Sequence, residues 1–410
     1  MGSLFIFIGI LIISAHLFAA FFSRWRVPDI LLLMAVGVLV GPILQWVTPS
    51  LLDQAGGILS SFTLLFILFD SGVDMRLSDV RRYWRGMVRI MLLSILAITA
   101  TVTITCTLLG LAWSSAMLLG VMLSGTAAAV VIPLINQMQV SSKLRTILSL
   151  ESALSAVICI ILTWAIIEGM KLGKVNPAGI LGPILFSFLL SAGLGLVVGV
   201  IWSHLLYHAR KLQQSMFLTP ALMFIIYGLV ETLGYNGSIA ALAFGIVLGN
   251  PHYFSQFTIT RWLDNKQHHN RHGIHQMHAL RRDEKSFYKE IVFILKTFFF
   301  VYIGICIPFT HFDTLLFGLV ITIVIFGTRC AVALATGRGQ SRYERIVVSI
   351  MTPKGLASAI LATMPEQVNN TMGYTVIPGA TFIKEVTYAV IFCSIIITSI
   401  LVAILKRKTT

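Results

Sequence analysis

Residues 124–133 read Ser124-Gly125-Thr126-Ala127-Ala128-Ala129-Val130-Val131-Ile132-Pro133 and interrupt an apolar run at 114–137. A second apolar run, at 343–364, is interrupted by Thr352-Pro353-Lys354-Gly355. Glycine and proline open the hydrogen-bond ladder of a helix and leave backbone N–H and C=O groups without partners. Inside a bilayer such groups are tolerated only where they line a cavity or bind a ligand. If the runs span a membrane, the two segments therefore predict a polar site within it.

The composition shows that the chain is an integral membrane protein. Its 410 residues are 57% hydrophobic and only 11% charged, against about 25% charged residues in an average soluble domain. The mean hydropathy is +0.89. These proportions exclude a soluble enzyme, a nucleic-acid-binding domain and a secreted disulfide scaffold. The five cysteines lie far apart, in or beside apolar runs and without metal-ligand spacing. We therefore expect no resident metal and no cofactor.

The apolar runs predict an all-α polytopic protein with about thirteen transmembrane helices. A spanning helix needs roughly 20 mostly apolar residues. The candidate spans are 2–22, 28–47, 55–73, 86–111, 114–137, 145–169, 177–206, 215–233, 236–250, 290–309, 313–335, 343–364 and 382–405. The eighth and ninth runs can also be read as one bent element around Gly234 and Gly237. That reading would reverse the orientation of everything after it.

The distribution of positive charge predicts the orientation, because cytoplasmic loops carry an excess of lysine and arginine. With thirteen spans and a cytoplasmic C-terminus, the inside segments hold 23 of the 30 basic residues. The outside segments hold Lys171, Lys174 and Lys384. We therefore expect a multi-pass membrane protein with its N-terminus outside and its C-terminus in the cytoplasm. The net charge of +14 is interpreted as loops facing anionic lipid and not as a nucleic-acid-binding surface.

The two interruptions lie seven spans apart, which is the offset that an inverted repeat requires. A single transporter domain at 1–410 would then contain repeats at about 1–170 and 215–405, linked by a helix at about 177–206. Paired interrupted helices are typical of the substrate site of inverted-repeat transporters. The alternative is coincidence, because glycine and proline are common in membrane helices.

A few charged residues lie deep inside the predicted spans. A charge near the bilayer centre costs roughly 2.5–3.5 kcal/mol, so such residues are expected to face a partner or a water-filled path. The deep basic residues are Lys296, Arg329 and Lys354, and the acids at comparable depth are Asp70 and Glu151.

Seven segments resemble one superfamily, the monovalent cation:proton antiporters, and especially its Kef-like archaeal and bacterial branch. The resemblance includes the broken-helix pair Gly125-Thr126, the segment beginning Leu150-Glu151-Ser152, and Met351-Thr352-Pro353-Lys354-Gly355. The other similar segments are 27–42, 65–74, 233–250 and 298–304. Each segment alone is a weak signal, but all seven occur in the family's order over most of the chain.

The resemblance implies a fold of thirteen helices in inverted repeats, with two discontinuous helices that cross. It also implies exchange of Na⁺ or K⁺ for H⁺ by alternating access, in a homodimer in a prokaryotic plasma membrane, without enzymatic activity. In the family the reaction centre is a carboxylate on the sixth helix. A carboxylate suits this role because it can hold a proton or a hard cation, but not both at once.

The sequence departs from the family pattern at residue 156. The segment reads Glu151-Ser152-Ala153-Leu154-Ser155-Ala156, with alanine where the family has aspartate. Position 127, where the family often has a second acid, is also alanine, although a neutral residue is common there in the Kef-like branch. A methyl group can neither take up a proton nor neutralise a cation.

Three explanations for Ala156 remain open. We favour an inactivated antiporter, engineered by one substitution, over a natural paralogue that has lost exchange. In the third, Asp70 or Glu151 carries the proton. Arg329 matches the family arginine that pairs with this glutamate, and such a pair would keep Glu151 charged. The alternative functions are a non-transporting membrane sensor and an uncoupled cation channel on the same fold.

The expected ion ligands are the hydroxyls of Thr126, Ser152 and Ser155 and the opened backbone at 125–128, including Ala127. Alternatively, the hydroxyls bond backbone carbonyls one helical turn earlier. Lys296 is either a counter-charge or structural, and Lys354 is expected to compensate helix-end dipoles at the crossing. The residues expected to break the helices are Gly125, Pro133, Pro353 and Gly355.

A predicted cytoplasmic loop at 252–289 is rich in histidine, with His268, His269, His272, His275 and His278. We favour a solvated loop, and a pH sensor or divalent-metal site is the alternative.

Overall fold

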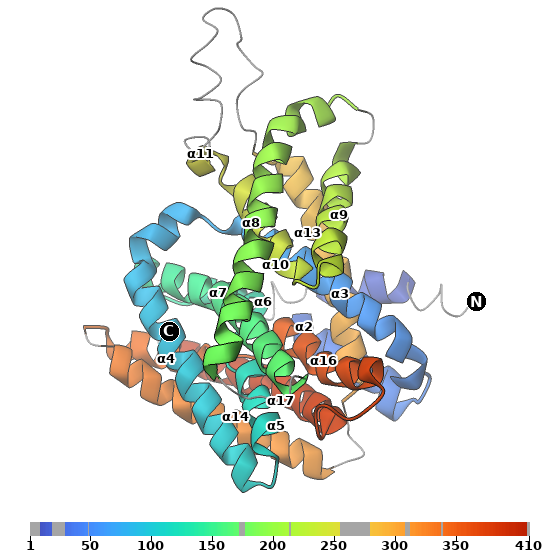
Figure 1. The fold of residues 1–410 in the computed structure, drawn as a ribbon. Coiled ribbons are helices and arrows are strands. Elements are labelled where there is room, and N and C mark those ends of the chain that lie inside the picture. Colours follow the sequence, from blue (N-terminus) through green and yellow to red (C-terminus); the bar gives the residue numbers. More distant parts are fainter. Residues whose placement is uncertain are drawn as a thin grey trace, which may run out of the picture. The chain divides into compact units, whose positions relative to one another are not determined.

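The computed structural model describes residues 9–18, 29–47, 49–171, 177–212, 215–254, 279–307, 312–337 and 339–407. Throughout these ranges the regular structure is helical (Figure 1). The all-α architecture predicted from the sequence is therefore confirmed, and the helices are consistent with thirteen spans. The predicted histidine cluster at 268–278 lies outside the described residues.

The helices follow the predicted apolar runs closely. The first half of the chain contains an apolar helix at Gly9–Phe18, α2 (Asp29–Val38) with a π-helical turn η1 (Leu39–Ile43), α3 (Pro49–Asp74), α4 (Leu77–Leu108), α5 (Trp113–Met122), α6 (Ala128–Asn136), α7 (Ser142–Lys171) and α8 (Pro177–Ala209). The second half contains η2 (Ser215–Phe217), α9 (Leu218–Thr232), α10 (Gly237–Gly249), α11 (Pro251–Phe254), α13 (Arg282–Ile305), α14 (Phe312–Thr336), α15 (Arg342–Ile350), α16 (Leu356–Met372) and α17 (Ala380–Arg407).

By length and hydropathy, six of the described helical segments could each cross a membrane unaided: 77–108, 142–171, 186–209, 215–232, 312–336 and 380–405. The fifth and twelfth predicted spans are absent from this group because each is divided into two shorter helices. The breaks fall at 123–127, between α5 and α6, and at 351–355, between α15 and α16. Pro133 lies inside α6 and not in the break, so its assignment as a helix-breaking residue needs correction. A proline removes one intrahelical bond, whereas the backbone at Ala127 is extended, with φ −84° and ψ 100°.

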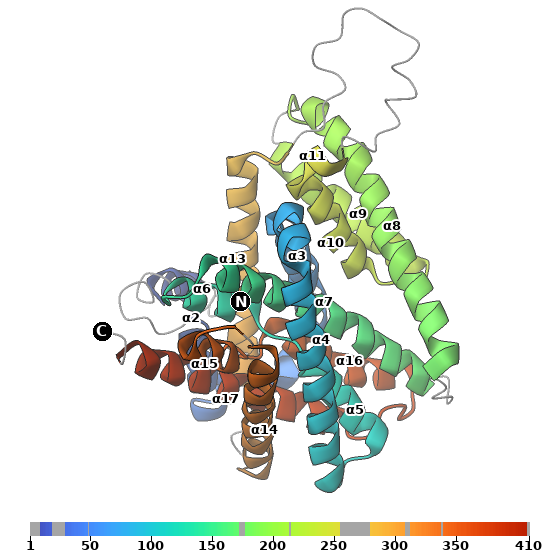
Figure 2. The same cartoon turned by 90° about the vertical axis from the view of Figure 1, so that its left-hand side faces the viewer.

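The eighth and ninth runs form two helices and not one bent element. The backbone turns at Gly234, whose φ is +80°. The side chain of Asn236 then caps α10 by accepting hydrogen bonds from the N–H groups of Ser238 and Ile239, at 3.0 and 3.2 Å. A Cβ on Gly237 would lie 2.6 Å from the carbonyl oxygen of Tyr227, so the chain returns closely along α9. Figure 2 shows α9 and α10 side by side.

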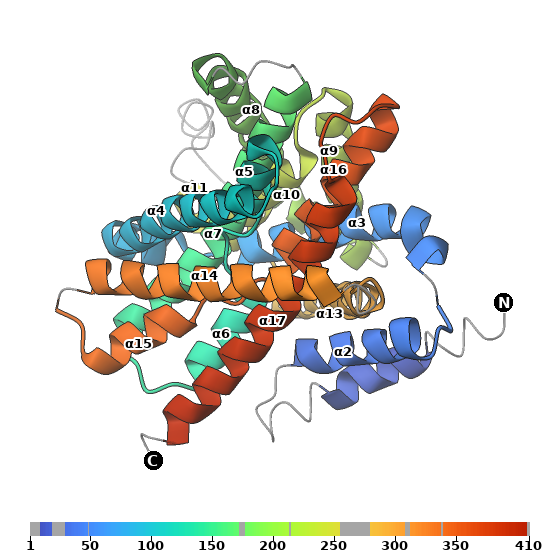
Figure 3. The same cartoon turned by 90° about the horizontal axis from the view of Figure 1, so that it is seen from below.

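The chain forms two compact units. The first comprises 1–61, 83–180 and 294–410, and contains both broken helices. Within it, α17 packs against α14 and α16, and α7 contacts α5, α6 and α16. Figure 3 shows α14 crossing α17. This unit therefore holds every element that the crossing needs.

The second unit comprises 62–82 and 181–293. At one end of it Arg210 forms an ion pair with Glu284, with the closest atoms 2.7 Å apart. Burial opposes ionisation of Glu284. Hydrogen bonds from Arg210 and from the Arg281 N–H outweigh this effect and lower the pKa of the carboxyl. The pair therefore holds the end of α8 against the start of α13.

Helices α3 and α10 pack so closely in the second unit that their backbones touch at glycines. A Cβ on Gly245 would lie 2.3 Å from the carbonyl oxygen of Phe69, and one on Gly249 would lie 2.3 Å from that of Val73. On the opposing helix, a Cβ on Gly72 would lie 2.4 Å from the carbonyl oxygen of Leu242. Glycines four residues apart permit this close approach between membrane helices.

We predict that G245A destabilises the protein by about 1–3 kcal/mol, because the added methyl group must push α3 away. The matched control is G228A in α9, where a Cβ would meet nothing within 4 Å. That substitution should be neutral or slightly stabilising, since alanine favours helices over glycine. Thermal unfolding of the detergent-purified variants measures both effects. Equal midpoints would contradict the packing argument.

Candidate functional site

The two breaks in the first unit cross and satisfy each other's backbone groups. The N–H of Ala127 donates to the carbonyl oxygen of Pro353 at 2.8 Å. The hydroxyl of Ser358 donates to the carbonyl oxygen of Met122, also at 2.8 Å. The crossing of two discontinuous helices, expected from the sequence, is therefore present.

Close approach at the crossing requires glycine at position 355. A Cβ there would lie 2.5 Å from the Cβ of Ala127, far inside van der Waals contact. Gly125 is similarly confined, because its Cβ would lie 3.0 Å from the Sγ of Cys159 on α7. Both glycines predicted to break the helices thus leave room for side chains of neighbouring segments, Ala127 beside Gly355 and Cys159 beside Gly125.

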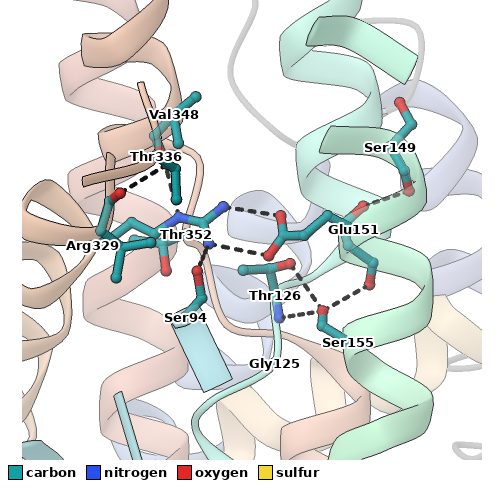
Figure 4. Close-up of polar contacts among 12 residues, drawn as sticks. Ser94, Gly125, Thr126, Ser149, Glu151, Ser155, Arg329, Thr336, Val348 and Thr352 are labelled. Atoms are coloured by element: carbon teal, nitrogen blue, oxygen red, sulfur yellow. Dashed lines mark hydrogen bonds and ion pairs between the residues drawn. The ribbon is translucent and has the colours of Figure 1, made fainter. Parts of the chain in front are cut away.

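Helix α7 supplies the third side of the site through Ser155. The Oγ of Ser155 accepts a hydrogen bond from the N–H of Thr126 at 3.2 Å and lies 3.2 Å from the Thr126 hydroxyl (Figure 4). Ser155 also donates to the carbonyl oxygen of Ser152, at 3.3 Å. Ser155 and Thr126 are buried. The structure therefore brings Thr126 and Ser155 together, whereas the hydroxyl of Ser152 donates to the carbonyl oxygen of Ser149, at 3.0 Å. It also contains the alternative, a hydroxyl bonded to a carbonyl one turn earlier.

Lys354 lies at the centre of the crossing. Its side chain is fully buried, and its Nζ donates to the carbonyl oxygen of Gly125 at 2.9 Å and to the Thr352 hydroxyl at 3.4 Å. Its backbone N–H donates to the Oγ of Ser394 on α17, at 3.0 Å. The carbonyl of Gly125 follows the end of α5, where a cation is stabilising. Compensation of helix-end dipoles by Lys354 remains a prediction.

Glu151 and Arg329 form a buried, bidentate ion pair beside the crossing (Figure 4). The two nitrogen–oxygen distances are 3.1 and 2.9 Å. Arg329 also donates to the hydroxyl of Ser94 on α4 and to the carbonyl oxygen of Val348 at the end of α15. Two parallel hydrogen bonds between charged groups fix both side chains strongly. The pair therefore ties α7, α14, α4 and α15 together.

Residue 156 lies next to the broken backbone. The Cα of Ala156 is 3.6 Å from the point that a Cβ on Gly125 would occupy, and the residue is partly exposed. Its methyl group can neither donate nor accept a hydrogen bond, so it takes no part in the hydrogen bonds of the crossing. Among the described residues, no group of three or more His, Cys, Asp or Glu side chains could hold a metal ion. The Glu151 carboxylate near the crossing is already paired.

The remaining predicted residues lie elsewhere. Asp70 is in α3 in the second unit, four residues before Asp74, which pairs with Lys289 at 2.9 Å. Lys296 lies in α13 and is partly buried. Their roles remain predictions.

Sequence reasoning did not identify Ser94, Val348, Ser358 or Ser394 as partners of the crossing. Polar side chains in apolar runs were the available signal for the three serines, whereas Val348 acts through its backbone and gave none.

The comparisons with known proteins agree with this geometry. A family model described as sodium/hydrogen exchanger, transmembrane, matches residues 11–407. The chain belongs to the sodium/hydrogen exchanger family. It is 23% identical to Na⁺/H⁺ antiporter 1 of Methanocaldococcus jannaschii, over 87% of this chain and 82% of that protein. It is 27% identical to the K⁺/H⁺ antiporter NhaP2 of Shewanella sp. (strain MR-4), over 59% of this chain and 43% of the relative. The chain thus spans less than half the length of the NhaP2 relatives that it matches.

The fold is shared with a solved member of the family. The sodium proton antiporter MjNhaP1 from Methanocaldococcus jannaschii superposes with a TM-score of 0.74, covering 96% of this chain and 98% of that chain at 20% identity. A second structure of the same antiporter superposes with a TM-score of 0.76 and covers the whole of this chain. The antiporter fold inferred from the sequence motifs is confirmed.

We predict that E151Q destabilises this exchanger-family protein by about 3–5 kcal/mol, because it leaves Arg329 buried without its counter-charge. E151Q/R329M, which removes both charges, should be less destabilised than E151Q alone. The control is E168Q, which breaks a more exposed pair with Lys171 and should cost at most about 1 kcal/mol. Thermal unfolding in detergent measures all three. A loss in E151Q no larger than that in E168Q would contradict the assigned role.

We also predict that G355A lowers the unfolding temperature because its new methyl group overlaps Ala127. The variant A127G/G355A removes the opposing methyl group and should recover most of the loss. A double variant no more stable than G355A would show that this contact does not determine the crossing geometry.

Proposed function

We propose that this fold exchanges a monovalent cation, Na⁺ or K⁺, for protons by alternating access, and that the chain with Ala156 is an inactive form. Membership of the exchanger family supports the exchange reaction, as do relatives named Na⁺/H⁺ and K⁺/H⁺ antiporters. We infer a transporter and not an enzyme. The substrates would be the cation and protons, with no further cofactor.

The observation that carries the proposal is the crossing of the two breaks against α7. The hydroxyls of Thr126 and Ser155 lie within hydrogen-bonding distance of each other, and the carbonyl oxygen of the adjoining Gly125 accepts a hydrogen bond from the Lys354 ammonium. Such oxygens can replace part of the hydration shell of an alkali ion. Residue 156 adjoins the same backbone, so a carboxylate at that position would supply the charge that these neutral ligands lack.

The inactive state follows from the chemistry of position 156. Competition between a proton and a cation for one carboxylate gives obligatory exchange, and alanine offers nothing to compete for. Glu151 is a poor substitute because Arg329 holds both of its oxygens. Asp70 belongs to the other compact unit.

The wider assignment follows the family and the charge pattern. We propose a homodimer in a prokaryotic plasma membrane, with the N-terminus outside and the C-terminus in the cytoplasm. Each chain would contain inverted repeats at about 1–170 and 215–405. The seven-span offset between the two breaks supports the repeats.

We predict that A156D restores exchange in proteoliposomes, at least about tenfold above the parent chain, because a carboxylate can again carry either proton or cation. Internal pH and cation uptake are recorded together under an imposed Na⁺ or K⁺ gradient. A156N is the control, since it has nearly the same size but does not titrate.

Cation uptake in A156D without proton movement would indicate a channel and contradict exchange. Folded A156D that moves neither ion would favour a non-transporting sensor and would also contradict the proposal.

A further inference from the structure

The oxygen atoms expected to bind an alkali ion already take part in hydrogen bonds within the protein. The Gly125 carbonyl accepts a hydrogen bond from the ammonium of Lys354. The Ser155 hydroxyl donates to Ser152 and accepts from the Thr126 N–H. Its remaining lone pair faces the Thr126 hydroxyl, which completes its capacity of one donor and two acceptor positions. At the Gly125 carbonyl, an incoming ion would therefore meet the Lys354 ammonium, which already binds that oxygen.

The charges at the crossing do not balance. Glu151 and Arg329 neutralise each other as a bidentate pair. The hydrogen-bond acceptors of the Lys354 ammonium are a carbonyl and a hydroxyl, both neutral. With alanine at 156, these three charged side chains leave a net charge of +1 in a buried position. A buried charge is usually paired, so Lys354 is the exceptional member of this group.

We infer that Lys354 is a tethered cation that occupies the position of the transported ion at the Gly125 carbonyl, and excludes alkali ions while residue 156 is neutral. The inference rests on the proposed function, because it concerns the same cation site. It makes Lys354 a residue that determines cation affinity, in addition to its role at the helix ends.

Two physical effects support exclusion. The tether gives the ammonium an effective concentration in the millimolar range or above, so that a free ion must compete with it. Two unit charges about 4 Å apart, at an effective dielectric constant of about 20, repel strongly enough to weaken binding by about three orders of magnitude. A carboxylate at 156 would offset this repulsion, whereas the methyl group of Ala156 cannot.

The experiment separates the charge of residue 354 from its hydrogen bond. K354Q keeps a donor for the Gly125 carbonyl but removes the charge, and K354R keeps both the donor and the charge. Each is made in the parent chain and in the A156D background. Binding of Na⁺ and of K⁺ to the detergent-purified proteins is measured by calorimetry at constant chloride, with choline as the replacing cation. K384Q, which removes an ammonium paired with Glu366 outside the crossing, is the control.

We expect A156D/K354Q to bind Na⁺ or K⁺ at least about tenfold more tightly than A156D/K354R. In the parent background, binding should be detectable for K354Q and absent for K354R. K384Q should behave as its parent. Affinities of K354Q and K354R that agree within about twofold in both backgrounds would overturn the inference. Lys354 would then act only as a hydrogen-bond donor.

A second measurement needs no change at Lys354. Raising the pH from about 7 to about 10 removes the proton of a lysine more readily than that of an arginine. The parent chain should therefore gain cation binding at high pH, and K354R should not. The titratable or charged neighbours of Lys354 are Cys159 and Glu151 on α7 and Arg329 on α14. All three are also present in K354R, so the comparison isolates residue 354. A pH response shared by both proteins would count against the inference.

Failure of the inference is distinguishable from failure of the proposed function. Cation binding that depends on the charge at residue 354, together with no flux in A156D, would support the inference about Lys354 and contradict the proposed exchange reaction. Coupled flux in A156D, with no effect of the charge at residue 354 on cation binding, would support the exchange reaction and overturn the inference about Lys354.

Discussion

The structure depends on one constraint: backbone groups opened inside hydrocarbon must find partners, and here the two breaks supply them to each other. The bond from the Ala127 N–H to the Pro353 carbonyl closes one gap in each helical ladder. Side chains from other helices supply further partners. The Oγ of Ser155 accepts a hydrogen bond from the Thr126 N–H, and the Oγ of Ser394 accepts one from the Lys354 N–H. Four short helices, α7 and α17 are thereby fixed together by the same few hydrogen bonds.

The buried charges follow from this arrangement. A crossing of broken helices collects helix ends, and exposed carbonyls at the end of a helix favour a cation. Lys354 meets that requirement at Gly125. The Glu151–Arg329 pair lies beside it and is internally neutral, with Ser94 and Val348 filling the remaining donor positions of the guanidinium. With alanine at position 156, the side chains of Glu151, Arg329 and Lys354 together carry a net charge of +1. A carboxylate at position 156 would balance it.

The sequence predicted the helices and their breaks because both depend on local chemistry. Apolar length defines a span, and Gly125 and Gly355 interrupt it. Pro133 was misplaced because a proline can remain inside a helix at the cost of one bond, as it does in α6. The separation of α9 from α10 was predicted from the span count and the charge distribution, since locally Gly234 and Gly237 suit a bend and a turn equally. The positive φ of Gly234 and the cap by Asn236 decide it. Partners such as Ser94 and Ser394 were missed because α4 and α17 each contain several hydroxyl side chains, and the sequence does not show which of them faces the crossing.

The same reasoning explains how the fold can persist with alanine at position 156. The hydrogen bonds that hold the crossing use the backbone at 125–127 and 353–354 and the side chains of Ser155, Ser358 and Ser394. A methyl group at 156 takes part in none of them, so the fold does not depend on a carboxylate there. The exchange that we propose would, by contrast, need a carboxylate at that position, because the nearby Glu151 is already paired with Arg329. Under this proposal, the stability of the crossing and the transport activity would depend on different atoms of the same short stretch of α7, so that activity could be lost while the fold remains.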